Sequence, residues 1–348
     1  MLVIPSLVAG GMERVMTELA GYFSGKTGHD IWLVSLVNRD LFYDLPERIT
    51  FIAPRFRMND GIRLLSLIKT YFFLRKQVRR VKPYTLLSFG GKYNSFVLLA
   101  CKGLSVKTYI SDRSRPGIGY GWLLDHLNPI TYRRADGIIA QTEHARQVIF
   151  EKTGHENIKV IGNPIHIINA GYQQRKTTIL NVGRFIPSKR QEELVRIFAD
   201  VRTGPWKLIF VGDGPGLPGT KSLAVQLGIE KYVEFVGFTK DVGKYYAESM
   251  IFAFTSLSEG FPNALAEAMS YGLACISYDC EAGPGDLIDD GVNGFLLPLN
   301  EGENYRIKLQ YLMDSPEVRQ SMGKAAIEKI RSYDISNIGN EYLEFITS

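Results

Sequence analysis

Residues 207–237 read KLIFVGDGPGLPGTKSLAVQLGIEKYVEFVG, and their pattern decides the fold. An apolar run at 207–212 leads into a glycine-rich loop and a helix-like segment, and a second apolar run follows at 233–237. Short apolar runs that alternate with amphipathic segments are typical of parallel strands covered by helices. The stretch therefore predicts one strand–helix–strand unit of an α/β domain.

The same alternation runs through most of the 348 residues, a length that favours two domains. It breaks at Asn163 and Pro164, where a crossing between domains is expected. We predict two doubly wound, Rossmann-like α/β domains, at 1–164 and 165–333, and a helix at 334–348 that could pack on either. The expected strands lie at 2–5, 30–37, 49–53, 84–89, 106–111, 137–141, 158–162, 178–183, 207–212, 233–237, 251–256 and 273–279.

Composition and charge indicate a folded protein. Of the residues, 45% are hydrophobic and 22% are charged, and the net charge is +5, as in ordinary globular domains. The three cysteines have no CxxC or metal-type spacing, which favours a reduced compartment. No apolar run is long enough to span a bilayer, and no signal peptide pattern precedes the first strand. We expect a cytoplasmic protein for which any membrane contact is peripheral.

The segment at 61–82, GIRLLSLIKTYFFLRKQVRRVK, contains seven cations and no acid. Leu, Ile, Tyr and Phe lie between the cations, as in basic amphipathic helices that bind anionic membrane surfaces. The alternative is a helix packed on its own domain with a solvated basic face, and the sequence favours neither. Nucleic acid is not an expected partner, because no nucleic-acid-binding motif accompanies the patch.

Polar loops follow the strands predicted for the second domain. Arg184 and Lys189 follow the first strand, Gly212 and its loop follow the second, and Glu259 follows the fourth. Open α/β sheets bind ligands beyond the carboxyl ends of their strands. Cations and glycines at helix starts suit phosphate, and carboxylates accept hydrogen bonds from sugar hydroxyls. This edge therefore predicts a site for a phosphorylated, hydroxyl-rich ligand.

Arg184 and Lys189 are candidates for binding a diphosphate. Arginine offers a rigid fork of donors and lysine a mobile charge, so the two would complement each other on a leaving diphosphate. The alternative is a pair of solvated surface charges. The chain has no Asp-x-Asp, which disfavours a metal-chelated diphosphate and favours neutralisation by protein cations.

Two carboxylates, Glu259 and Glu267, flank the Gly-Phe-Pro turn of SEGFPNALAEAMSYG at 258–272. Asn263 is expected to cap the following helix, and helical spacing predicts that Glu267 emerges between Ala264 and Ala268 toward a ligand. An isolated pair of glutamates would more often be a loop charge and an exposed helix residue. Only the other loops of this edge favour the functional interpretation.

Two loops of the first domain are further candidates. Gly10 and Gly11 stand between a strand and a helix, where a ligand can approach backbone amides. The loop is not GxGxxG, so NAD binding is not expected. Asp112 and Arg113 follow another strand and are candidates for an acid, a base or an acceptor clamp, or for a turn with salt bridges.

The motifs GRFIPSK, VGDGP, VEFVGF and EGFPNALAEAMSYGLACI, in this order, resemble the family 4 retaining glycosyltransferases of the GT-B fold. IPSLVAGGMERV and ISDRSRP resemble the bacterial members that assemble surface polysaccharides and oligosaccharides. The most specific element is the pair Glu259 and Glu267, which matches the E-x7-E motif of the family. The resemblance covers nearly the whole chain. It implies two domains that close over the donor, with the helix at 334–348 returning to the first domain.

The resemblance also implies a role for each matching position. Arg184 and Lys189 would bind the nucleotide diphosphate, Glu259 the donor sugar and Glu267 the ribose. Asp112 and Arg113 would contact the reacting sugar or the acceptor, although many relatives have a histidine at the position of Arg113. The other implied donor-binding positions are Gly10, Gly11, Gly212, Val236, Gly237, Phe238, Phe261, Asn263 and Ala264.

The implied activity is retaining transfer of a hexose or N-acetylhexosamine from a nucleotide sugar, with UDP favoured, to a glycan acceptor. The acceptor would be lipid-linked, at the inner face of the cell membrane, and the basic segment at 61–82 would contact that surface. No metal and no cofactor are implied. The alternatives are a GT-B epimerase or phosphorylase, and a non-catalytic nucleotide-sugar-binding protein.

Overall fold

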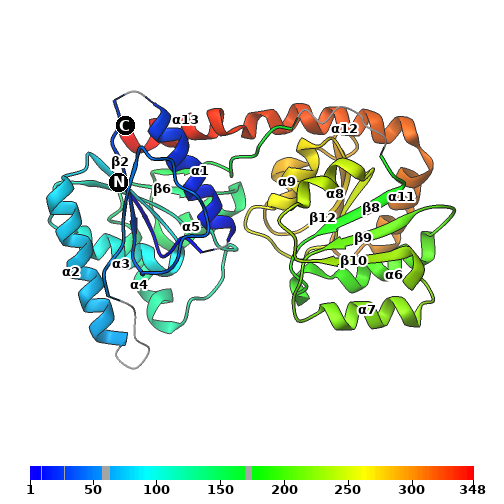
Figure 1. Ribbon diagram of the computed structural model, residues 1–348, viewed down its shortest axis with the longest axis horizontal. Helices are drawn as coiled ribbons and strands as arrows, with labels where there is room; N and C mark the ends of the chain where they lie inside the picture. Colours follow the sequence, from blue (N-terminus) through cyan, green and yellow to red (C-terminus); the bar gives the residue numbers. More distant parts are fainter. Residues whose placement is uncertain (9, 27, 57–62, 169–174) are drawn as a thin grey trace. The chain divides into compact units, whose positions relative to one another are not determined.

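The computed structural model describes residues 1–8, 10–26, 28–56, 63–168 and 175–348. The chain divides into two compact units, one formed by Met1–Pro164 with Ile335–Ser348 and the other by Ile165–Asp334. Each unit is a parallel sheet with helices on both faces (Figure 1). The predicted doubly wound α/β class is confirmed for both.

The sheet of the first unit has, in the described part of the chain, seven parallel strands in the order β3-β2-β1-β4-β5-β6-β7. Its central strands are buried on both faces, as expected for a parallel sheet covered by two helical layers. The strands are β1 (Leu2–Ile4), β2 (Ile31–Ser35), β3 (Ile49–Ile52), β4 (Thr85–Phe89), β5 (Lys107–Ser111), β6 (Gly137–Ala140) and β7 (Ile158–Val160).

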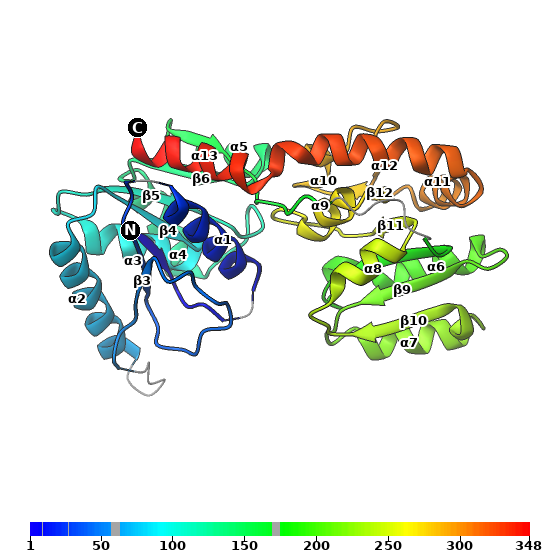
Figure 2. The ribbon, with the colours of Figure 1, turned by 45° about the horizontal axis from the view of Figure 1, so that its top comes forward.

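Helices cover the two faces of this sheet unequally. One face carries α2 (Arg63–Val81), α3 (Gly91–Cys101), α4 (Trp122–Tyr132) and α5 (Glu143–Thr153), each packed on the next. On the other face α1 (Gly11–Gly25) and α13 (Ile335–Thr347) lie side by side (Figures 1 and 2). The Tyr22 hydroxyl donates to Asn340 at 2.7 Å, and a Cβ on Gly339 would lie 2.2 Å from the Tyr22 ring. A glycine is therefore required where α13 crosses α1.

The basic segment predicted at 61–82 forms α2, and residues 61–62 lie outside the described residues. Lys76, Arg79 and Arg80 are exposed, as expected for a charged face. Arg75 differs, because its guanidinium donates to the carbonyl oxygens of Ala100 at 2.7 Å and Lys102 at 2.9 Å. Arg75 therefore satisfies carbonyls at the carboxyl end of α3.

The second unit is built on a sheet whose order, within the described residues, is β10-β9-β8-β11-β12-β13. Five of these strands follow the predicted apolar runs, whereas β13 lies outside the predictions because its run is only GFLLP, bounded by a glycine and a proline. The strands are β8 (Thr178–Val182), β9 (Lys207–Val211), β10 (Val233–Gly237), β11 (Ile251–Phe254), β12 (Ala274–Asp279) and β13 (Gly294–Pro298).

Separate apolar clusters fill the two faces of this sheet. One cluster involves helices α6, α7 and α11, and the other α8, α9 and the end of α12 (Figure 1). The helices are α6 (Gln191–Val201), α7 (Leu217–Gln226), α8 (Val242–Glu248), α9 (Asn263–Ser270), α10 (Pro284–Leu287), α11 (Gly302–Asp314) and α12 (Pro316–Ile330). Of all the helices in the described ranges, none has the length and apolar character to cross a bilayer.

Candidate active site

Three glycines meet where β8, β9 and β10 end in the second unit. The Gly183 amide donates to Val211 at 3.0 Å, and the Gly212 amide donates to Gly237 at 2.9 Å. Gly212 has a φ of +141°, and a Cβ there would lie 2.0 Å from the Gly183 carbonyl oxygen. Gly212 is thus needed for close backbone packing, and its engaged amide is not available to a phosphate.

The loop after β8 is tied to the loop after β11. A 3-10 turn at Pro187–Lys189 ends at Arg190, which has a left-handed φ of +49°. The Thr255 hydroxyl donates to the carbonyl oxygens of Lys189 at 3.0 Å and Arg190 at 3.1 Å. The Leu257 amide donates to Ser188 at 2.7 Å. These bonds position the two loops that carry the predicted cations and Glu259.

Lys189 and Glu259 form an ion pair in which the side chains are only 20% and 9% exposed. The ammonium of Lys189 also lies 5.4 Å from the centre of the Phe254 ring. Arg184, in contrast, is exposed, and its side chain has no hydrogen-bonding or ionic partner within the described ranges. The structure therefore brings Lys189 to a carboxylate and leaves Arg184 able to meet a ligand.

Helix α9 carries Glu267 on a half-buried face, while Leu265 and Met269 point into the core as helical spacing predicted. The helix begins at Asn263 itself with Pro262 before it, so the prediction that Asn263 caps the helix was wrong. Proline already fixes the backbone at the entry to the helix, and the side chain of the next residue is within the first turn.

Tyr246 of α8 is the partner of Glu267 that the motif did not reveal. Its hydroxyl donates to Glu267 Oε2 at 3.1 Å and lies 3.2 Å from the Ala264 carbonyl oxygen. Its ring stacks on Tyr271 with centroids 5.4 Å apart. Glu267 therefore emerges beside two tyrosines. Ala268, which was expected to flank Glu267 on the side open to a ligand, is buried.

The remaining donor-binding candidates of the second unit divide into exposed and buried positions. Phe238 is 73% exposed, next to the half-buried Val236 and to Gly237, which has a φ of +80° and open space around it. Phe261 instead belongs to the core, where its ring packs on Tyr333. Its side chain supports the turn before α9.

In the first unit the predicted glycine loop opens α1 at Gly11. The Tyr43 hydroxyl donates to the Gly10 carbonyl oxygen at 2.8 Å and accepts from the Gly10 amide at 3.2 Å. A Cβ on Gly10 would lie 2.2 Å from Glu13 Oε2, so this carboxylate folds back over the helix start. Burial raises the pKa of Glu13. The sequence motif revealed neither Tyr43 nor Glu13.

Asp112 follows β5 and accepts three hydrogen bonds. Its donors are the Tyr120 hydroxyl at 2.9 Å, the Ser114 amide at 3.2 Å and the Tyr132 hydroxyl at 3.4 Å. Burial raises the pKa of Asp112, and the bonds from Tyr120 and Ser114 offset this only in part. Asp112 is thus a half-buried carboxyl group held by two hydroxyls and one amide.

Arg113 is held inside the first unit. Its guanidinium donates to the Tyr342 hydroxyl of α13 at 2.9 Å and to the side-chain oxygen of Asn163. It also lies 4.5 Å from the centre of the Phe89 ring. These contacts join the loop after β5 to the returning helix. The guanidinium of Arg113 is therefore engaged in contacts within the first unit.

Two Rossmann-like parallel-sheet units define a GT-B fold, and comparison with known proteins gives the family. Residues 9–167 match the model "Glycosyltransferase Family 4", and residues 166–329 match "Glycosyl transferases group 1". The two models adjoin and cover almost the whole chain. The chain belongs to the family 4 glycosyltransferases, and it is a glycosyltransferase.

Full-length relatives act in bacterial glycan assembly. "Amylovoran biosynthesis glycosyltransferase AmsD" of Erwinia amylovora is 26% identical over 334 residues, covering 93% of this chain and 92% of that protein. "N-acetylgalactosamine-N,N'-diacetylbacillosaminyl-diphospho-undecaprenol 4-alpha-N-acetylgalactosaminyltransferase" of Campylobacter jejuni is 24% identical over 360 residues, covering 99% and 98%. The solved structure of Anabaena Alr3699/HepE in complex with UDP shares the fold, with a TM-score of 0.80 at 18% identity over 99% of this chain and 98% of that one.

Proposed function

We propose that this glycosyltransferase transfers a hexose or N-acetylhexosamine from a UDP-sugar to a lipid-linked glycan, with retention and without a metal ion. The observation that carries the proposal is the largely buried pair Lys189 and Glu259, with the exposed Arg184 on the same loop as Lys189, at the carboxyl edge of a parallel sheet. The name of the Campylobacter relative supports a diphospho-undecaprenol-linked acceptor. The UDP held by the Anabaena neighbour supports the nucleotide.

The donor would lie along this edge. Arg184 and Lys189 would neutralise the diphosphate, which is why the proposal needs no metal. The ammonium of Lys189 has three donors, so it can hold Glu259 and a phosphate oxygen together. Glu267, oriented by Tyr246, would accept the ribose hydroxyls.

Several further positions would complete the donor site. The edge at 236–238, where Phe238 is exposed, would hold the base. Gly10 and Gly11 stay predicted donor-binding positions. Asn263 and Ala264 would present the first turn of α9. Gly212 and Phe261 would support the site through packing, because the amide of the first and the ring of the second are engaged.

The chemistry would be front-face displacement. The acceptor oxygen forms its bond to the anomeric carbon on the face from which the diphosphate leaves. The electron pair of the breaking carbon–oxygen bond passes to the diphosphate, and the acceptor proton moves to that phosphate oxygen. Arg184 and Lys189 stabilise the charge that develops there, a contribution of about 3 kcal/mol for one such donor. Glu259 stabilises the positive charge at the anomeric carbon.

Helix α2 supports a membrane contact by the first unit. Leu64 and Phe72 are 72% and 64% exposed, and Leu65, Leu67 and Ile68 are exposed beside them, whereas polar Ser66, Thr70 and Gln77 are buried. A helix that exposes apolar residues and buries polar ones marks an interaction face. Because the exposed cations Lys76, Arg79 and Arg80 continue this face without an acid, we propose an anionic lipid surface as its partner.

A panel of UDP-, GDP- and ADP-sugars tests the donor by thermal shift, since a ligand of the folded state raises its melting temperature. With the donor that binds, transfer to a short-chain lipid diphosphate glycoside is followed by NMR, which reads the anomeric configuration, with and without EDTA. Glu259→Gln and Arg184→Ala are expected to lower kcat by about 10²-fold or more. Exposed Arg196→Ala in the same unit is the matched control. Unchanged turnover in the two site variants would refute the roles of Glu259 and Arg184. Inversion of configuration would refute the retaining mechanism, and loss of activity in EDTA would refute metal independence.

A further inference from the structure

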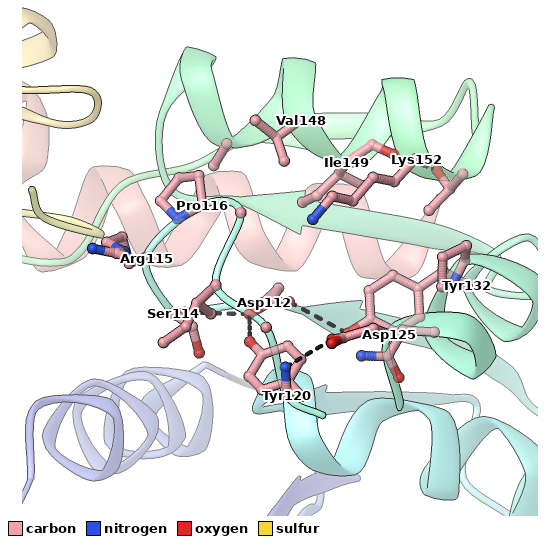
Figure 3. Close-up of a pocket in the computed structure, with 17 residues that line it drawn as sticks. Asp112, Ser114, Arg115, Pro116, Tyr120, Asp125, Tyr132, Val148, Ile149 and Lys152 are labelled. Atoms are coloured by element: carbon pink, nitrogen blue, oxygen red, sulfur yellow. Dashed lines mark hydrogen bonds between the residues drawn. The ribbon is translucent and has the colours of Figure 1, made fainter. Parts of the chain in front are cut away.

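The first unit contains a cavity of about 400 Å³ that none of the donor-site motifs explains. Its walls come from the loop after β5, from α4 and from α5 (Figure 3). The volume falls in the range of roughly 300–1,000 Å³ that is usual for small-molecule sites. The cavity begins at Asp112, at the carboxyl end of a parallel strand, which is where open α/β sheets bind ligands.

One side of the cavity is a cluster of oxygen atoms. Asp112, with the hydroxyls of Tyr120 and Tyr132 on its carboxylate, forms its floor (Figure 3). A second carboxylate, Asp125, accepts from the Tyr120 amide at 2.7 Å and also lines the space. Carboxylates and tyrosine hydroxyls in a partly dry pocket are the groups that exchange hydrogen bonds with sugar hydroxyls.

The opposite side is apolar and comes from α5. Figure 3 shows Val148 and Ile149 facing the oxygen cluster across the cavity, with Lys152 beside them. Pro129 of α4 and Ile118 of the loop add apolar surface to the lining of the cavity. An apolar wall opposite a polar floor matches a pyranose ring, which presents C–H groups on its faces and hydroxyls around its edge.

The hydroxyl of Tyr120 occupies one oxygen of the Asp112 carboxylate that forms the floor. A Cβ placed on Gly91 would lie 2.1 Å from this hydroxyl and 2.6 Å from Asp112 Oδ2, so the tyrosine is lodged against the start of α3. Its loop has glycines at 117, 119 and 121, two of them with positive φ and with open space around them. The loop that carries Tyr120 therefore has open space around two of its glycines, Gly117 and Gly121.

We propose that this cavity binds a sugar ring of the acceptor, and that one acceptor hydroxyl replaces the Tyr120 hydroxyl on Asp112. The inference rests on the proposed glycosyl transfer and assigns the acceptor side of it. Asp112 then orients the bound ring, Asp125 keeps the loop in place, and the α5 wall packs on one face of the ring. The chemical class of the ligand is a neutral pyranoside.

Saturation-transfer NMR of the full-length protein in saturating UDP tests the cavity. The probes are methyl α-glycosides of galactose, glucose, mannose, N-acetylgalactosamine and N-acetylglucosamine, with farnesyl phosphate as the apolar probe. At least one glycoside is expected to bind the wild type. Ile149→Trp, which fills the cavity, is expected to weaken that binding by at least about tenfold, while Ile130→Trp, on the exposed side of α4, leaves it unchanged.

Tyr120→Phe is the second variant, and it is expected to raise the affinity for the glycoside rather than lower it. Because the glycoside no longer has to displace a hydroxyl from Asp112, its affinity is expected to rise by about two- to tenfold, the worth of one hydrogen bond. A merely structural role for Tyr120 would lower the affinity. This variant decides the matter if Ile149→Trp does not fold.

Several outcomes would overturn the inference. The inference fails if no glycoside binds, or if the wild type and a folded Ile149→Trp variant bind a glycoside equally. It also fails if Tyr120→Phe binds the glycoside more weakly than the wild type does. Binding of farnesyl phosphate alone would assign the cavity to a lipid chain. The thermal shift by UDP separates this failure from a failure of the proposed function. If UDP stabilises the wild type and no glycoside binds, only the cavity is wrongly assigned; if no nucleotide or nucleotide sugar binds, the proposed function fails.

Discussion

Lys189 and Glu259 are linked more closely than two separate motifs suggest. Each side chain is largely buried, so removing one partner leaves an uncompensated charge at a cost of roughly 3–5 kcal/mol. Lys189 therefore holds the Glu259 side chain in place, while its own ammonium remains within reach of a ligand. Arg184, which is exposed, has no such structural duty. We expect changes at Lys189 to affect stability as well as catalysis, and changes at Arg184 to affect catalysis alone.

Asp112 gives a pH-dependent prediction at the same scale. Because burial raises its pKa in the folded state, its contribution to stability is fully present below the unfolded-state pKa of about 3.9 and is lost as the pH rises through the folded value. Asp112→Asn cannot ionise and avoids this loss. The melting temperature of the variant minus that of the wild type is therefore expected to increase between about pH 4 and pH 7.

Scanning calorimetry at several pH values measures this difference. Asp44→Asn removes the same charge from an exposed side chain and is the matched control. A difference that stays constant with pH, or that decreases, would contradict a raised pKa of Asp112.

At the scale of single elements, periodicity predicted which side of α9 is buried but not what its polar side meets. Leu265 and Met269 lie in the core as expected, because helical spacing alone fixes their direction. Tyr246 could not be found in this way, since it reaches Glu267 from another helix and depends on how α8 and α9 pack. For the same reason the motif at Gly10 did not reveal Tyr43, which reaches Gly10 from a distant part of the chain.

Most strands were predictable, because both faces of a parallel strand are buried and the sequence shows a continuous apolar run. The edge strand β13 was not, since its run is short and is bounded by Gly294 and Pro298. The contact of Arg75 with the end of α3 was not predictable either, because charge alone does not reveal a nearby helix end. The predictable part is therefore what repeats along the chain, and the rest is what depends on contacts between elements.

Gly212 gives a prediction for the loop between β9 and α7. Alanine there would adopt an unfavourable φ and would meet the Gly183 carbonyl oxygen, so Gly212→Ala is expected to lower the free energy of unfolding by about 2–5 kcal/mol. Gly228 also has a positive φ, of +67°, but has open space around it. Gly228→Ala should therefore cost only the backbone term, about 1–2 kcal/mol.

Urea unfolding followed by circular dichroism compares the two variants. Equal losses of stability would show that the close approach to Gly183 is relieved at little cost, and would contradict the packing role assigned to Gly212.

At the scale of the whole molecule, α2 is expected to control binding to anionic vesicles. Reversing Lys76, Arg79 and Arg80 to Glu removes three cations that each contribute about 1 kcal/mol at such a surface. Binding to phosphatidylglycerol vesicles in flotation assays is expected to fall by about 100-fold or more. At high salt, where charge is screened, the remaining binding is expected to depend on the apolar residues. Replacing Leu65, Ile68 and Phe72 by Ser is therefore expected to weaken vesicle binding measured at high salt.

The matched control reverses three exposed cations of the second unit, Lys207, Lys231 and Lys324. If this control weakens vesicle binding as much as the α2 variant does, net charge rather than the α2 face governs the interaction, and the membrane proposal for α2 fails.

The return of α13 to the first unit has a consequence for how the protein is made. Ribosomes release a chain from its beginning, and early domains usually fold first. Here α13, which packs on α1 and carries Tyr342, the partner of Arg113, is synthesised after the whole second unit. The second unit can therefore fold while the first still exposes apolar surface beside α1. During synthesis, the half that begins the chain is the last to be completed.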